Sequence, residues 1–239
     1  MTNSTSRLKW NAGANFVGLG YATVIGVVIL PLYLQYLGAE AFGLVGFFLI
    51  LQGWMHIFDF GTSPLLARQT AQARGQNADF VELRKLLRSL EIILVIVSAL
   101  VFFAIVGGSG WISDNWLKVD SLEGGDVSTS IVLMGAIIGF RFFASLYRSG
   151  VQGMENQVQL NIANIFVVTL RYVGALLLLE FYTQDVRNFF VYQLAVGVLE
   201  ALILSVLFYR SIPAGDKPGV KMYWRSLEPV LPFAGCNPL

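Results

Sequence analysis

Apolar residues along the chain form long runs separated by short polar segments, and six of these runs have the length of a membrane span. A helix rises about 1.5 Å per residue, so about 20 apolar residues cross the hydrocarbon core of a bilayer. The predicted spans are 11–36, 41–60, 89–106, 128–147, 158–181 and 189–209. The pattern therefore predicts an all-α, polytopic membrane protein that forms a six-transmembrane-helix bundle.

Composition supports this class and narrows the chemistry. Hydrophobic residues make up 56% of the chain and charged residues 13%, whereas about a quarter of the residues of a soluble protein are charged. One histidine and one cysteine argue against a disulfide and against a zinc-type site. The sequence has no Walker motif, dinucleotide fingerprint or nucleophile elbow. We therefore expect no enzyme activity, no cofactor, no metal and no nucleic-acid partner.

Basic residues are distributed unevenly between the predicted loops. With the N-terminus inside, twelve basic residues lie on the cytoplasmic side, and only Lys118 and Arg187 lie outside. The twelve are Arg7, Lys9, Arg68, Arg74, Arg84, Lys85, Arg88, Arg148, Arg210, Lys217, Lys221 and Arg225. The positive-inside rule then predicts that both ends of the six-helix unit are cytoplasmic.

A change in composition after the sixth span predicts the domain organisation. Residues 1–210 are expected to form a six-helix transmembrane lobe. Residues 211–223, which are rich in proline, glycine and charge, are expected to be a cytoplasmic linker. Residues 224–239 begin another apolar element, and we interpret them as the truncated start of a second lobe.

Two arginines lie inside apolar runs, Arg141 in the fourth span and Arg171 in the fifth. A cationic side chain at bilayer depth costs about 2.5–3.5 kcal/mol on insertion scales, so such residues usually face a bundle interior or a hydrated cavity. Five of the six spans also carry polar residues at helical spacing. These include Asn11, Asn15, Gln52, His56, Asp59, Ser145, Arg148, Asn161, Asn164, Gln193 and Glu200. The pattern predicts a polar lumen between the helices.

Simpler interpretations apply to the same residues. Asparagine and glutamine in membrane helices often only hydrogen-bond a neighbouring helix. Arg141 and Arg171 are alternatively expected to form internal ion pairs with Asp59 or Glu200. Glu91 is interpreted as an interfacial residue at the inner end of the third span. The spacing of Gly135 and Gly139 matches a helix-packing pattern.

Three stretches resemble the polysaccharide-biosynthesis flippases, the Wzx-type family of the multidrug/oligosaccharidyl-lipid/polysaccharide (MOP) exporter superfamily. Residues 31–38 (PLYLQYLG) and 41–44 (AFGL) resemble their first hairpin. Residues 58–61 (FDFG) and 65–68 (LLAR) resemble the stretch that closes their second helix. Residues 147–154 (YRSGVQGM), with Asn161, Asn164 and Arg171, resemble their fourth-to-fifth helix hairpin. The resemblance covers about residues 8–235, which corresponds to the N-terminal half of a MOP-type transporter.

The resemblance implies a multi-pass protein of the bacterial inner membrane that flips undecaprenyl-diphosphate-linked oligosaccharides to the periplasmic leaflet. These units supply O-antigen, capsule or exopolysaccharide synthesis, so polymerase and assembly proteins are possible partners. The substrate path would use Arg141, Arg171, Arg68, Asn15, Asn161 and Asn164, with Arg68 at the inner mouth. Coupling to H⁺ or Na⁺ would use Asp59, Glu200 and His56.

Three other interpretations remain open from the sequence. One is a small-solute or drug exporter of the same superfamily. Another is a non-transporting membrane partner in a polysaccharide assembly system. The third is an inactive truncated remnant of such a system.

Overall fold

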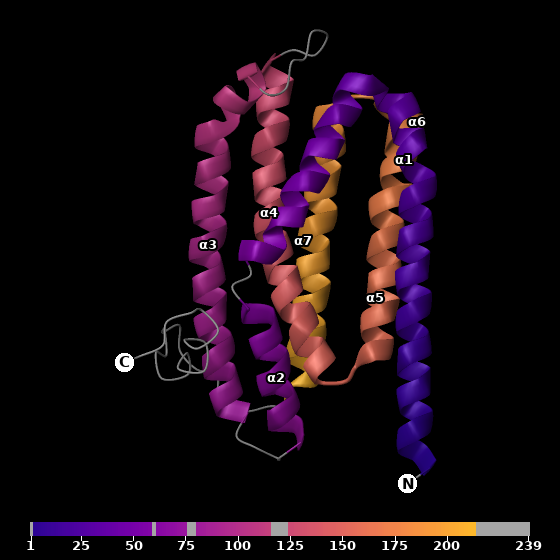
Figure 1. Cartoon of the computed structure of the whole chain (residues 1–239), viewed down its shortest axis with the longest axis vertical. Helices are drawn as coiled ribbons and strands as arrows, with labels where there is room; N and C mark the ends of the chain where they lie inside the picture. The colour runs from indigo at the N-terminus through magenta and orange to yellow at the C-terminus, as the bar shows by residue number, and fades with distance from the viewer. Residues whose placement is uncertain (1, 59–60, 76–79, 116–123, 214–239) are drawn as a thin grey trace.

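The computed structural model describes residues 2–58, 61–75, 80–115 and 124–213, and these residues form a bundle of helices (Figure 1). The helices are α1 (Thr2–Phe58), α2 (Thr62–Gly75), α3 (Phe80–Asn115), α4 (Gly124–Gly153), α5 (Gln157–Thr169), the π-helix η1 (Leu170–Gly174), α6 (Ala175–Phe181) and α7 (Val186–Ser211). The all-α prediction is confirmed for the described part of the chain.

The helix α1 contains two of the predicted spans, because its backbone reverses at Gly38. That residue has φ 79° and ψ 170°, a conformation that glycine adopts without the steric cost of a Cβ. Figure 1 shows the two arms of α1 meeting at one end of the bundle. The described residues contain five segments long and apolar enough to cross a membrane, and the first, Gly20–Trp54, includes this reversal. The chain is therefore a polytopic helical membrane protein.

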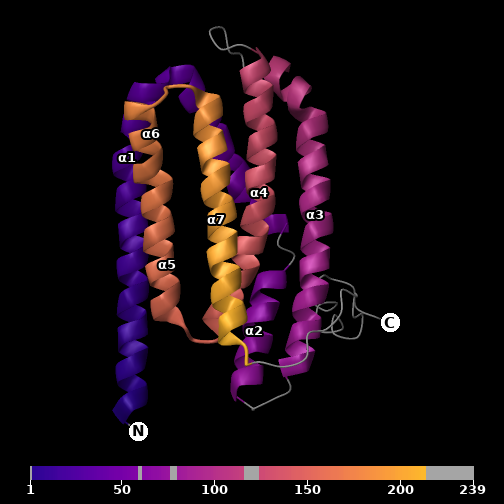
Figure 2. The same ribbon diagram turned by 180° about the vertical axis from the view of Figure 1, so that it is seen from behind.

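The beginning of α1 and the end of α7 lie at the same end of the bundle (Figures 1 and 2). The two ends of the chain lie together in this way when the chain crosses the length of the bundle an even number of times. The short helix α2 lies at the same end, where it continues the chain after the second arm of α1. Which side of the membrane this end faces stays a prediction from the basic residues.

Several helices extend beyond their predicted bounds. The helix α3 adds residues to both ends of the predicted span 89–106, and α4 continues to Gly153. The predicted spans 128–147 and 158–181 left a connection of ten residues, but residues 148–153 are helical and only Met154–Asn156 leave the helix. Glu155 makes the reversal with a φ of 57°, in the left-handed region.

Glycines in α4 allow close helix packing instead of forming turns. A Cβ added at Gly135 would lie 3.3 Å from Phe102 and Ile105 of α3, so this glycine faces α3 as the packing pattern predicted. A Cβ at Gly150 would lie 2.6 Å from the Phe208 ring of α7, and one at Gly153 would lie 2.5 Å from the Ala67 carbonyl oxygen of α2. The end of α4 is therefore fitted tightly between α2 and α7.

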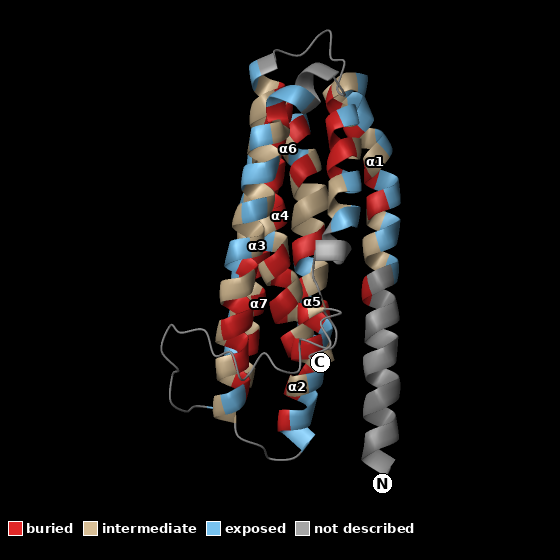
Figure 3. Cartoon of the chain, turned by 60° about the vertical axis from the view of Figure 1, so that its left-hand side comes forward, coloured by how far each residue is buried: buried red, intermediate tan, exposed pale blue. Residues whose placement is uncertain are grey.

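Burial follows the expected division between lipid-facing and interior surfaces. Figure 3 shows the buried residues on the sides of the helices that face one another, with exposed residues on the outer sides. Large exposed apolar side chains such as Val27, Leu100 and Phe103 suit contact with lipid tails. Inside, Tyr33 packs edge-to-face on Phe189, with ring centroids 5.2 Å apart. These contacts hold the first arm of α1 against the start of α7.

Candidate functional site

The residue Arg171 lies in η1, where one turn of π-helix interrupts the span formed by α5 and α6. A π-turn widens the helix and leaves backbone carbonyls out of register with their usual donors, and such turns are frequent at functional sites. Three side chains from other helices donate to these carbonyls. Tyr192 donates to Leu170 at 2.7 Å, Tyr33 to Tyr172 at 2.8 Å, and Gln193 to Arg171 at 3.3 Å. The position of Arg171 is thus fixed by α1 and α7 together.

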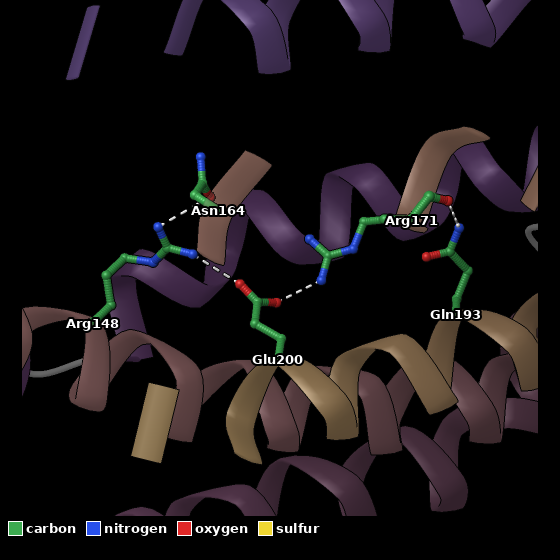
Figure 4. A network of polar contacts seen from close by, with 5 residues as sticks. All are labelled: Arg148, Asn164, Arg171, Gln193 and Glu200. Atoms are coloured by element: carbon green, nitrogen blue, oxygen red, sulfur yellow. Dashed lines mark hydrogen bonds and ion pairs between the residues drawn. The ribbon is translucent and has the colours of Figure 1, made fainter. Parts of the chain in front are cut away.

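The carboxylate of Glu200, on α7, holds two arginines at once (Figure 4). Arg171 donates from Nη2 to Oε2 of Glu200 at 2.5 Å, and Arg148 donates from Nη2 to Oε1 at 2.9 Å. The side chains of Glu200 and Arg171 are 8% and 12% exposed, and that of Arg148 is 30% exposed. The pair between Arg171 and Glu200 was one of the two alternatives drawn from the sequence, and the structure confirms it.

The residue Arg148 belongs to this network and not to a loop. It lies in α4, and its Nη1 donates to Oδ1 of Asn164 at 3.1 Å, which links α4 to α5 (Figure 4). The assignment of Arg148 to a cytoplasmic loop is corrected here, because α4 continues through it. Arg148 follows Arg141 by seven residues, about 10 Å along the same helix face.

These residues line a cavity of about 420 Å³ between α1, α4, α5, η1 and α7. Its lining comprises Gln52, Gly53, Arg141, Phe142, Ala144, Ser145, Arg148, Asn164, Arg171 and Glu200. Arg141 differs from the other two arginines in its contacts. Arg148 and Arg171 each form an ion pair with Glu200, whereas no ion pair joins Arg141 to a described residue. The cavity thus contains one guanidinium that makes no direct ion pair with a described residue.

The charge in the cavity favours an anion. Three guanidinium groups face one carboxylate, so the described lining residues carry a net charge of +2. Arginine presents several N–H donors in a planar fork that matches carboxylate and phosphate oxygens. Between side chains that are mostly buried, such charge–charge interactions are stronger than in bulk water. The arrangement is therefore suited to an acidic group that enters the bundle.

Two other residues predicted for the path, Arg68 and Asn161, are not part of the cavity lining. Arg68 is exposed on α2. Asn161 is buried beside Gly18, where its Oδ1 would lie 3.2 Å from an added Cβ, and its Nδ2 has no hydrogen-bond partner among the described residues. Asn15 and His56 lie in α1, but their side chains are outside the described residues, as is Asp59 entirely.

The interpretation of Glu91 as an interfacial residue is wrong. Glu91 is 8% exposed, and its Oε1 accepts hydrogen bonds from Tyr147 at 2.8 Å and Tyr209 at 2.7 Å. Its Oε2 accepts from Arg88 at 2.8 Å. Glu91 therefore ties α3 to α4 and α7. The two tyrosines were missed because each lies near the end of an apolar run, where an interfacial aromatic residue is also common.

A sequence comparison assigns almost all of the described chain to a single protein family. A family model described as "Polysaccharide biosynthesis protein" matches residues 8–228. No curated protein and no solved structure gives a significant match. The matched residues include every described helix that lines the cavity, from α1 to α7. The chain is therefore a multi-pass membrane protein that belongs to the polysaccharide biosynthesis protein family, the family of the Wzx-type flippases.

Proposed function

We propose that the chain takes part in flipping undecaprenyl-diphosphate-linked oligosaccharides across the bacterial inner membrane, and that its cavity receives the diphosphate. The observation that carries the proposal is the group of three arginines, Arg141, Arg148 and Arg171, around one cavity inside a membrane bundle. Cationic residues at this depth are unfavourable in lipid, so they are expected where an anionic group passes.

Charge balance favours a diphosphate over a neutral ligand. A diphosphate that joins a lipid to a sugar carries one negative charge on each phosphate. These two charges match the net +2 of the described cavity lining. Arg141 has no ion pair with a described residue, so its guanidinium is available to an incoming phosphate oxygen. The ligand would thus neutralise a site that is otherwise left cationic.

The same charges argue against the drug-exporter alternative for cationic drugs. A cationic compound would face three guanidiniums and only one carboxylate, which is already held by two of them. The proposal assigns the chain the role of a carrier, in which the described cavity supplies hydrogen-bond donors and positive charge. Coupling to H⁺ or Na⁺ stays part of the proposal, with Asp59, His56 and Glu200 as candidates.

The test uses a strain that lacks the gene and is complemented with wild-type protein or with Arg141→Ala. We expect the variant to lose surface polysaccharide while lipid-linked repeat units accumulate in the cytoplasmic leaflet. The matched control is Arg187→Ala, which removes an exposed arginine at the start of α7, away from the cavity lining. Full surface polysaccharide with Arg141→Ala, at normal protein abundance, would refute the cationic path.

The deletion strain itself separates the remaining alternatives. Loss of surface polysaccharide with normal synthesis of lipid-linked repeat units supports flipping. Wild-type polysaccharide in the deletion strain supports an inactive remnant. A non-transporting assembly partner predicts that repeat units still reach the periplasmic leaflet but are not polymerised. Leaflet location is measured by the accessibility of the repeat unit to a membrane-impermeant sugar-modifying reagent.

A further inference from the structure

Glu200 occupies the place between two arginines that an anion would take. Its two carboxylate oxygens each accept from a different guanidinium, Oε1 from Arg148 and Oε2 from Arg171 (Figure 4). The carboxylate is buried, comes from α7, and lines the cavity together with both arginines. Two separated oxygens that bridge two guanidiniums are also what one phosphate group offers.

We propose that Glu200 is an internal competitor of the ligand, and that binding proceeds by exchange of its carboxylate for the phosphate oxygens on Arg148 and Arg171. The proposal rests on the proposed function and deepens it by assigning a specificity role to Glu200. Arg141 offers a contact that requires no exchange, because it has no ion pair with a described residue to break. The phosphate then replaces the carboxylate on the other two arginines.

The exchange gives the site a way to reject small anions. Chloride is a weaker hydrogen-bond acceptor than a carboxylate, so it would replace the two charge-assisted bonds of Glu200 with weaker contacts. A phosphate or diphosphate can restore both with charge-assisted bonds and can also reach the free Arg141. Specificity then arises because a weakly binding anion cannot displace Glu200 from its two ion pairs. The site thus rejects wrong ligands in addition to attracting the correct one.

The exchange would also link binding to helix position. Glu200 lies on α7, Arg148 on α4 and Arg171 on η1, so its carboxylate joins three elements that belong to different parts of the bundle. Displacement removes two bonds between α7 and its neighbours. The ligand can shift the arrangement of these helices only to the extent that it binds the released form better. The two hydrogen bonds of Glu200 therefore couple ligand binding to the contacts between α7 and its neighbours, because they are present without the ligand and broken when it binds.

The experiment measures binding of two probes to the purified full chain in detergent or nanodiscs by calorimetry. Inorganic pyrophosphate supplies the free diphosphate, and farnesyl diphosphate supplies a diphosphate on a prenyl chain. The key variant is Glu200→Gln, and we expect it to bind the diphosphate at least about tenfold more tightly than wild type, which corresponds to about 1.4 kcal/mol. The control is Glu180→Gln, which removes an exposed carboxylate of α6 and is expected to bind like wild type.

A second variant distinguishes competition between Glu200 and the ligand from the electrostatic effect of removing a negative charge. Glu200→Asp keeps the negative charge but is shorter by one methylene, so it cannot hold both guanidiniums as Glu200 does. Competition predicts tighter diphosphate binding for this variant too, whereas a general electrostatic effect predicts no change. In an Arg171→Ala background the gain from Glu200→Gln should fall to a few fold, because one of the two competed contacts is already absent.

The outcomes distinguish this inference from the proposed function. If wild type binds diphosphate and Glu200→Asp binds it no more tightly, the exchange is overturned whatever Glu200→Gln does, and the proposed function is left standing. No binding of either probe to wild type or to Glu200→Gln overturns both. If both Glu200→Gln and Glu200→Asp bind either probe more tightly than wild type does, the exchange is supported. Preference for farnesyl diphosphate then identifies a lipid headgroup, and equal binding identifies the diphosphate alone as the recognised group.

Discussion

We expect Arg141→Ala and Arg171→Ala to differ in stability, because Arg141 has a role in function only, whereas Arg171 also stabilises the fold. Both arginines bury an Nε that has no partner among the described residues, and an unsatisfied buried donor costs about 1–3 kcal/mol. Truncation of either side chain removes that cost and also loses the packing of its aliphatic stem. For Arg141 these two changes roughly cancel, so the free energy of unfolding should change by less than about 1 kcal/mol.

The Arg171→Ala variant loses an additional contact. Its Nη2 hydrogen-bonds Glu200 at 2.5 Å, in a pair whose side chains are 12% and 8% exposed. A hydrogen bond to a charged group contributes about 1.5–3 kcal/mol. The loss stays below the 3–5 kcal/mol or so that follows when a buried charge is left entirely unpaired, because Glu200 keeps Arg148. We therefore expect Arg171→Ala to be about 2 kcal/mol less stable than Arg141→Ala.

The assay is thermal unfolding of the purified variants in detergent, followed by monodispersity or circular dichroism. For a chain of this size, 1 kcal/mol shifts the midpoint by about 2–4 °C, so the two variants should differ by about 4–8 °C. Both should lose transport. Equal midpoints for the two variants, or a lower midpoint for Arg141→Ala, would refute the assignment of Arg141 as the free cation and Arg171 as the paired one.

Three further changes test the packing and polar contacts around the site. Gly153→Ala should destabilise the protein by about 1–3 kcal/mol, because the added Cβ would lie 2.5 Å from the Ala67 carbonyl oxygen and force α2 away from α4. Glu91→Ala should lower stability by about 2–3 kcal/mol, since two tyrosine hydroxyls and a partly exposed arginine lose their acceptor. Tyr33→Phe should cost about 0.5–1.5 kcal/mol, as the carbonyls of η1 lose a donor. Thermal midpoints in detergent measure all three.

The glycine and tyrosine changes each have a matched comparison. Gly46→Ala adds a Cβ with nothing within 4 Å, so it should be neutral or stabilise α1 by up to about 1 kcal/mol. If Gly153→Ala is as stable as Gly46→Ala, the close approach of α2 and α4 is wrong. Tyr182→Phe removes a hydroxyl from an exposed tyrosine and should leave the midpoint unchanged. A loss with Tyr182→Phe equal to that with Tyr33→Phe would contradict the role assigned to η1.

The sequence predicted the helices well because apolar length is a strong signal in a membrane protein. Backbone groups in lipid must be hydrogen-bonded within their own segment, so a long apolar run has few alternatives to a helix. The reversal at Gly38 was also predictable, since glycine tolerates the positive φ found there. The helix ends were predicted less well, because polar residues such as Arg148 and Ser149 continue a helix as readily as they begin a loop.

The site was predicted in part. Arg141, Arg171, Asn164 and Glu200 were selected because polar residues in apolar runs are rare, and the structure brings all four to one cavity. The ion-pair partners of these residues could not be assigned from the sequence. Helical spacing shows which face of a helix a residue occupies, but not which other helix that face contacts. The pair between Arg171 and Glu200 was one of two alternatives, and the addition of Arg148 to it required the tertiary structure.

The sequence by itself determined the class of protein, the approximate spans and the presence of buried cations, because each depends on local hydrophobicity and charge. The tertiary structure decided which arginines are neutralised and which is free. It also decided that η1 forms at Arg171, since the donors to its carbonyls, Tyr33 and Gln193, come from α1 and α7. Contacts between residues 22 to 139 positions apart leave no local pattern, so only the packing of the bundle specifies them.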